Sequence, residues 1–175
     1  MLKKIVIGIA VIVATVLAFA ATKPDTFHFE RSATIAAPPE KIAALVTDFR
    51  QWQVWSPWED LDPQMMRTFR GPESGPGAVY EWSGNSSAGQ GRMEVLSASA
   101  EEIEIKLDFI KPMATSNMLR FALTPRPQGT EVVWSMDGPM PYLSKLMTVF
   151  VSMETLLAND FERGLADLKA AAERG

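Results

Sequence analysis

The sequence predicts an α+β domain in which a curved antiparallel β-sheet packs against a long C-terminal helix, behind an apolar N-terminal helix. Three patterns predict it: an uninterrupted apolar run at the start, short segments of alternating polarity in the middle, and apolar residues every three or four positions at the end. With 175 residues, 47% of them apolar, the chain has room for one domain after the N-terminal segment.

The N-terminal segment, residues 1–22, is predicted to be a transmembrane anchor or an export signal. Lys3 and Lys4 precede an apolar run from Ile5 to Ala21 in which Thr15 is the only polar side chain. As a helix this run would be about 26 Å long, just short of a hydrocarbon core of about 30 Å. The small-x-small pattern at 18–20 also fits a signal-peptidase site. A retained anchor and a cleaved signal therefore both remain open.

Both alternatives predict the same location for the rest of the chain. Lys3 and Lys4 are expected to stay on the cytoplasmic side, so the chain after Pro24 would be exported. The sequence thus predicts a single-pass protein of the cell inner membrane with its domain on the periplasmic side. If the segment is cleaved, the domain is released there instead.

The folded domain is predicted to span residues 25–173 and to begin with a strand over Thr26–Ile35, where apolar and polar residues alternate. The prolines and acid of residues 37–40 then favour the start of a short amphipathic helix. The following segment holds Trp52, Trp55 and Trp58 within seven residues. Because indoles bury large areas, we expect this segment to be a structural cover packed on the helices and the sheet.

The middle of the chain is predicted to be an antiparallel meander, because short alternating segments are separated by Gly, Pro, Asn and Ser. The pattern is clearest where Ile103, Ile105 and Leu107 alternate with charged residues, which indicates one buried and one solvent-exposed face. A weak strand is expected at Met66–Phe69. Five further strands are predicted at Ala78–Ser83, Arg92–Ser97, Glu102–Phe109, Ser116–Leu123 and Thr130–Met136.

The C-terminal segment from Tyr142 to Glu173 is predicted to form one amphipathic helix of about eight turns. Its apolar face should cover the concave face of the sheet, since neither element can bury its apolar side alone. Gly164 is predicted either to let a strand or an aromatic ring approach closely or to leave a plain packing gap. The face comprises Leu143, Leu146, Met147, Phe150, Met153, Leu157, Phe161, Leu165 and Leu168.

Composition excludes several classes of function. The absence of Cys excludes disulfides, Cys-ligated zinc, iron–sulfur clusters and thiol nucleophiles. The single His28 excludes a metal site that needs two histidines from one chain. All 21 acidic residues follow Ala21, whereas Lys3 and Lys4 precede it, so the domain is acidic and nucleic-acid binding is not expected. No metal site and no other cofactor are predicted.

No catalytic residue is assigned from the sequence. His28 lies on the polar face of its strand, which favours a solvated surface position over an acid–base role. Strand alternation turns Glu81 away from the face shared by Tyr80 and Trp82. The acids on either side of Phe161, at positions 160 and 162, are expected to be solvated or salt-bridged.

The order of elements and several short motifs resemble the helix-grip fold of the START-like superfamily. The closer resemblance is to the exported branch of the polyketide cyclase/dehydrase and lipid-transport family, also called SRPBCC proteins. It covers about residues 25–172. The motifs that carry it are Arg31-Ser32, Ile35-Ala36-Ala37-Pro38-Pro39-Glu40, Asp48-Phe49, Trp55-Ser56-Pro57-Trp58, the segment Gly77–Asn85, Gly129-Thr130 before Val132 and Trp134, and Asp160-Phe161-Glu162 with Gly164-Leu165.

The resemblance implies a deep cavity between the sheet and the long helix, open at one end. Ten Met residues would suit a pocket for varied apolar ligands, because the thioether chain adapts to irregular shapes. A solid core is the alternative interpretation of the same residues. The residues predicted to line the cavity and bind a ligand are Tyr80, Trp82, Trp134, Met136, Met147, Phe150, Met153 and Leu157.

The leading functional hypothesis is a membrane-tethered, noncatalytic binding or carrier domain for a hydrophobic small molecule or lipid. Its rival is an enzyme of cyclase, dehydratase or hydrolase type, and the third alternative is a structural domain with a filled core. A ligand would need a continuous apolar cavity of roughly 300 Å³ or more. Two or more titratable groups converging inside it would favour the enzyme.

Overall fold

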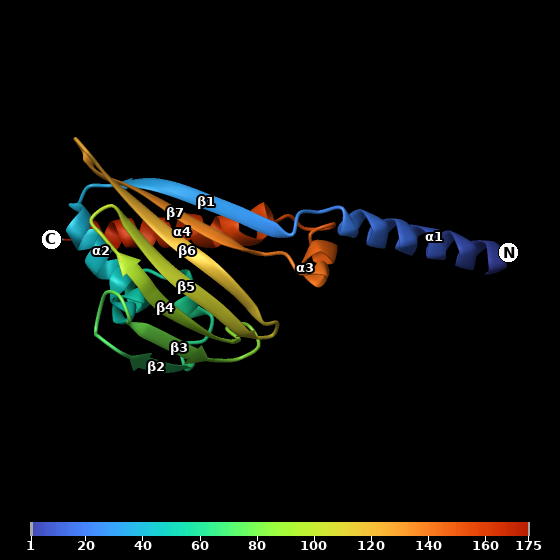
Figure 1. The fold of residues 1–175 in the computed structure, drawn as a ribbon, viewed down its shortest axis with the longest axis horizontal. Helices are drawn as coiled ribbons and strands as arrows, with labels where there is room; N and C mark the ends of the chain where they lie inside the picture. Colours follow the sequence, from blue (N-terminus) through green and yellow to red (C-terminus); the bar gives the residue numbers. More distant parts are fainter. Residues whose placement is uncertain (1, 175) are drawn as a thin grey trace.

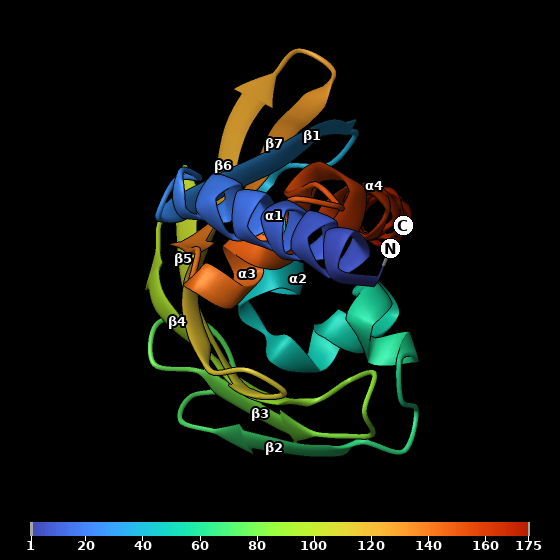
Figure 2. The same cartoon turned by 90° about the vertical axis from the view of Figure 1, so that its right-hand side faces the viewer.

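The computed structural model describes residues 2–174 and has an α+β fold. A seven-stranded antiparallel sheet, in the order β1-β7-β6-β5-β4-β3-β2, curves around one long helix, α4 (Figures 1 and 2). This arrangement confirms the predicted helix grip. The strands are β1 (Thr26–Ile35), β2 (Met66–Arg70), β3 (Val79–Ser83), β4 (Gln90–Ala98), β5 (Glu102–Lys111), β6 (Thr115–Arg126) and β7 (Gly129–Pro139).

The strands form where polarity alternates, and the alternation decides which side chains face the helix. Along β5, Ile103, Ile105 and Leu107 are buried while the charged residues between them are partly exposed. The weak segment at Met66 does form a strand, β2, at the edge of the sheet. The strand predictions are therefore confirmed, with ends that agree to within three residues.

The prediction of a single C-terminal helix from Tyr142 to Glu173 is wrong. The chain forms a short helix, α3 (Tyr142–Met147), and a long one, α4 (Met153–Glu173), with a break between them. The break contains the β-branched residues Thr148, Val149 and Val151, whose side chains restrict χ1 and disfavour helix. It ends at Ser152, whose Oγ accepts a hydrogen bond from the Thr155 backbone N–H at 3.1 Å and caps α4.

Three short helices connect β1 to β2 and cover part of the concave face of the sheet. Within them, Trp52 and Trp55 are buried, and their indole N–H groups donate to the carbonyl oxygens of Val46 (2.9 Å) and Leu45 (3.1 Å). Trp58 is only half-buried. The prediction of a structural cover is thus confirmed, since the half-buried Trp58 also packs edge-on against Trp134 of the sheet and Phe161 of α4. The short helices are α2 (Pro39–Thr47), η1 (Phe49–Val54) and η2 (Pro57–Asp60).

An aromatic stack joins the sheet to α4. The Trp134 ring lies between Phe121, with a centroid distance of 5.0 Å, and Phe161, at 4.2 Å. A Cβ at Gly164 would lie 2.8 Å from Cζ3 of Trp134, so of the two predictions for this glycine the close approach of a ring is the one found. Arg31 of β1 also forms ion pairs with Glu154 and Glu162 of α4.

The apolar N-terminal helix, α1 (Leu2–Ala21), projects from one end of the domain (Figure 1). An 18-residue window within it has a mean hydropathy of 2.5, and only 6% of that window is buried. By length and composition this helix could cross a membrane. Whether it is an anchor or a signal stays a prediction.

Candidate ligand cavity

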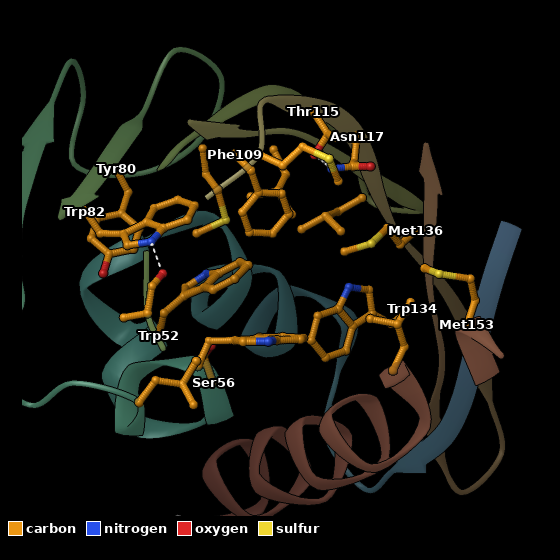
Figure 3. A pocket seen from close by; sticks show the side chains of 18 of the residues that line it. Trp52, Ser56, Tyr80, Trp82, Phe109, Thr115, Asn117, Trp134, Met136 and Met153 are labelled. Carbon is orange, nitrogen blue, oxygen red and sulfur yellow. Dashed lines mark hydrogen bonds between the residues drawn. The ribbon is translucent and has the colours of Figure 1, made fainter. Parts of the chain in front are cut away.

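A cavity of about 250 Å³ lies between the concave face of the sheet and the layer formed by η1, η2 and α4 (Figure 3). Its walls are mainly aromatic and aliphatic, with several Met side chains and few polar groups. The lining residues are Phe27, Trp52, Ser56, Trp58, Glu59, Leu61, Met65, Tyr80, Trp82, Ala88, Met93, Leu107, Phe109, Met113, Thr115, Asn117, Leu119, Trp134, Met136, Pro139, Met140, Ser144, Met153 and Leu157.

Six of the eight residues predicted to line the cavity lie on its wall: Tyr80, Trp82, Trp134, Met136, Met153 and Leu157. The other two, Met147 and Phe150, lie outside it and are 56% and 74% exposed. Their prediction depends on a single continuous helix, which would carry them along the same face as Met153 and Leu157. The break between α3 and α4 removes that continuity, so their predicted place in the wall is wrong.

The Trp82 indole forms part of the wall because the residue opposite it in the sheet has no side chain. Trp82 in β3 pairs with Gly91 in β4, and a Cβ at Gly91 would collide with the indole ring. The indole Nε1–H donates to the carbonyl oxygen of Ala88 at 3.0 Å, shown as a dashed line in Figure 3. The glycine and this hydrogen bond together fix the ring over the sheet.

One buried polar network reaches the wall. The Tyr80 hydroxyl donates to Oε1 of Glu59 at 2.7 Å, and Nε of Arg67 donates to Oε2 of the same carboxylate at 2.7 Å. Burial, and then the hydrogen bond to Glu59 and the negative charge of that carboxylate, raise the pKa of Tyr80 well above its usual value. Both carboxylate oxygens are therefore occupied, and Arg67 balances the charge of Glu59.

A second polar feature is the Trp134 indole. Among the side-chain nitrogens and oxygens of residues 2–174, Nε1 of Trp134 is the buried atom without a hydrogen-bond partner. In Figure 3 this nitrogen points toward the space below Met136. Asn117 is also buried at the wall, and its Nδ2 has only a long contact of 3.5 Å to Oγ1 of Thr115. These groups could donate hydrogen bonds to a bound molecule.

The sequence did not identify the polar part of the wall. Glu59 was missed because helical and strand periodicity give no sign of burial in the short η2 helix. The available signal was an acid directly after Trp58 in a segment between two prolines, with Arg67 eight residues later. Several apolar wall residues in loops and strand ends were missed for the same reason, including Met113.

The other titratable residues considered in the sequence lie outside the cavity. The side chain of His28 is 55% exposed and its Nδ1 lies 2.7 Å from Oδ1 of Asp137. Glu81 accepts a hydrogen bond from Arg70 at 3.0 Å, and Glu162 pairs with Arg31. Within the described part of the chain, no three His, Asp or Glu side chains gather in a way that could hold a metal ion.

Comparisons with known proteins agree with this fold. A family model described as polyketide cyclase/dehydrase and lipid transport matches residues 26–173. Among curated proteins the sequence finds no match.

Solved structures share the fold at low sequence identity. Protein CV1439 from Chromobacterium violaceum is 17% identical, with a TM-score of 0.59, over 87% of this chain and 100% of that one. The di-domain ARO/CYC StfQ of the steffimycin biosynthetic pathway is 14% identical, with a TM-score of 0.64, over 85% of this chain and 51% of that one. The Aha1 dimer from Colwellia psychrerythraea is 17% identical, with a TM-score of 0.59, over 85% and 98%.

Proposed function

We propose that this chain, which belongs to the polyketide cyclase/dehydrase and lipid transport family, is a membrane-tethered domain that binds a hydrophobic small molecule or lipid in its cavity. The observation that carries the proposal is the cavity itself. It lies between sheet and helix, and apolar side chains form most of its wall. A filled core would leave no such space.

The size of the cavity limits the ligand. Its volume of about 250 Å³ lies just below the expected 300 Å³ and the range of about 300–1,000 Å³ typical of pockets for drug-sized ligands. It exceeds an engineered apolar cavity of about 150 Å³ that binds benzene in another protein. A compact apolar molecule, or the apolar end of a longer lipid, fits this size.

The polar groups at the wall suggest one further property of the ligand. An unpaired buried N–H costs free energy, and a ligand acceptor that bonds to Nε1 of Trp134 would remove that cost. Met136 lies two residues further along β7 on the same wall, and its flexible side chain could admit the acceptor. We therefore expect a mainly apolar ligand that carries a carbonyl, ether or hydroxyl oxygen.

The tether in this proposal is α1. Its length, its hydropathy and its exposure support a helix in lipid, and the two lysines before the run support a domain outside the cytoplasm.

Photo-cross-linking tests the binding proposal. The full chain, held in amphipol, is irradiated with a diazirine-bearing fatty acid, and the labelled peptides are identified by mass spectrometry. We expect labels on wall residues such as Met113 and Leu119, because the apolar chain should enter the cavity. Labels confined to α1 and the outer surface would contradict the proposal.

A matched pair of variants provides the control. Leu157 lines the cavity from α4, whereas its neighbour Leu156 is exposed. Leu157→Trp would fill part of the space and displace about 50 Å² of ligand contact, which at about 25 cal/mol per Å² lowers labelling roughly tenfold. Leu156→Trp should leave labelling of the wall unchanged.

One observation favours catalysis as a second candidate function. Two titratable groups, Glu59 and Tyr80, meet at the wall at 2.7 Å, which is the feature expected of an enzyme. The raised pKa of Tyr80 makes it a poor proton donor, and both oxygens of Glu59 are already engaged by Tyr80 and Arg67. Conversion of a copurified ligand by the wild-type chain, but not by Tyr80→Phe, would favour this function.

A further inference from the structure

The cavity reaches the end of the sheet at which α1 leaves the domain. The strand register pairs Thr26 with Pro139, Gln90 with Lys111 and Met66 with Ser83. These strand ends therefore all lie at the same end of the sheet. Residues of the cavity wall at this end of the sheet include Met113 in the β5–β6 connection and Pro139 at the end of β7. Figure 2 views the molecule from this end, with α1 and α3 in front.

Exposed apolar side chains gather at the same end. Outside α1, five of the large exposed hydrophobic residues of the described chain lie in α3 and in the break that follows it. A soluble domain seldom exposes so many in one region, and such patches mark interaction sites. We call the following residues the apolar rim: Tyr142, Leu143, Met147, Phe150 and Val151.

Polar contacts fix most of this rim to the end of α1. The Tyr142 hydroxyl donates to the Leu17 carbonyl oxygen at 2.9 Å, one turn before α1 ends. Nζ of the buried Lys145 lies 2.5 Å from Oδ1 of Asp25, and Nζ of Lys23 donates to the Thr148 carbonyl oxygen at 2.5 Å. Only four residues separate α1 from β1, so the chain can extend no more than about 14 Å there.

We propose that the apolar rim lies in the headgroup layer of the bilayer that α1 crosses, so that the cavity opens toward lipid. The inference rests on the proposed membrane tether. With α1 across the bilayer, the bond from Tyr142 to Leu17 places α3 at the depth of the last helical turn. Tyr is typical of that depth, and exposed Leu, Met and Phe side chains are stabilised there. The ligand then enters from the lipid phase and needs no passage through water.

Site-directed spin labelling tests the position of the rim. The chain has no Cys, so a single introduced Cys gives one label in the full-length protein. The variants Val11→Cys, Phe150→Cys, Met113→Cys and Leu96→Cys are reconstituted in phosphatidylcholine vesicles, and each label is exposed to oxygen, which concentrates in lipid, and to a water-soluble nickel chelate.

We expect the label at position 11 to be relaxed more by oxygen than by nickel, the label at 96 to show the reverse ratio, and the labels at 113 and 150 to give a ratio between these two. A label at 150 that behaves like the one at 96, while position 11 reports lipid, would overturn the inference and leave the tether intact. A label at 11 that reports water would refute the tether itself. Shielding of position 150 from both reagents, with dipolar broadening, would show that a second copy covers the rim and would also overturn it.

Discussion

Gly91 determines where the Trp82 indole can lie in the cavity wall. A Cβ at this position would collide with the indole and would lie 2.7 Å from the Asp108 carbonyl oxygen. Gly91→Ala should therefore lower the free energy of unfolding by about 1–3 kcal/mol through overpacking. Chemical denaturation followed by circular dichroism measures the change.

A double-mutant cycle separates the indole contact from the backbone contact. In a Trp82→Leu background the collision with the ring is absent, so Gly91→Ala should cost less there than in the wild type. Equal costs in both backgrounds would show that the ring is not held by Gly91.

His28 allows a test of the hydrogen bonds on the solvent-exposed face of the sheet, because it is the only histidine in the sequence. Its hydrogen bond to Asp137 across β1 and β7 raises its pKa above the usual value of about 6.5, with a smaller contribution from Glu30. The stabilisation from the charged imidazole is then full below pH 6.5 and is lost as the pH rises through the raised pKa. It should be small, since the side chain is more than half exposed.

An NMR titration of the single imidazole gives this pKa directly. Asp137→Asn should move it back toward 6.5. A wild-type value at or below 6.5, or one that does not respond to the substitution, would contradict the pairing.

At the scale of elements, the cap at the start of α4 is the feature that divides the C-terminal region in two. Ser152→Ala removes the side-chain acceptor for the Thr155 N–H and should lower the free energy of unfolding by about 1 kcal/mol. Ser86→Ala, in the exposed β3–β4 loop, is the control and should change it by less than about 0.5 kcal/mol. If the two variants are equally stable, the break does not depend on the cap.

The same region shows how far periodicity alone can predict a fold. The strands were predictable because alternation of period two is produced directly by one buried and one wet face, as along β5. The apolar residues of the last segment also recur with a helical period, but this period does not show where the backbone stops favouring a helix. The β-branched residues at 148, 149 and 151 and the Ser152 cap end one helix and begin another, and so Met147 and Phe150 lie outside the wall.

The candidate site was predictable to the extent that regular elements build it. Tyr80, Trp82, Trp134 and Met136 lie on strand faces whose orientation follows from alternation. Glu59 and its partners depend on how a short helix packs against the sheet over a long sequence separation. The acid after Trp58 and Arg67 eight residues later are only a weak local sign of this contact, so the network became apparent only in three dimensions.

For the whole molecule, the proposed tether predicts a topology. Protease added to intact spheroplasts should digest the domain after Pro24, because the lysines before the apolar run keep the N-terminus inside. Alkaline carbonate should leave the protein with the membranes if α1 is retained and release it if α1 is cleaved. Complete protection in spheroplasts, with digestion only after lysis, would contradict the topology.

Native mass spectrometry of the full chain, released from detergent, tests ligand binding in the cavity most directly. We predict that the wild-type protein retains an apolar molecule of defined mass, that Leu156→Trp retains it too, and that Leu157→Trp loses it because its indole occupies the space between α4 and the sheet. A wild-type protein that carries no such molecule, or one that all three proteins carry equally, would contradict ligand binding in the cavity.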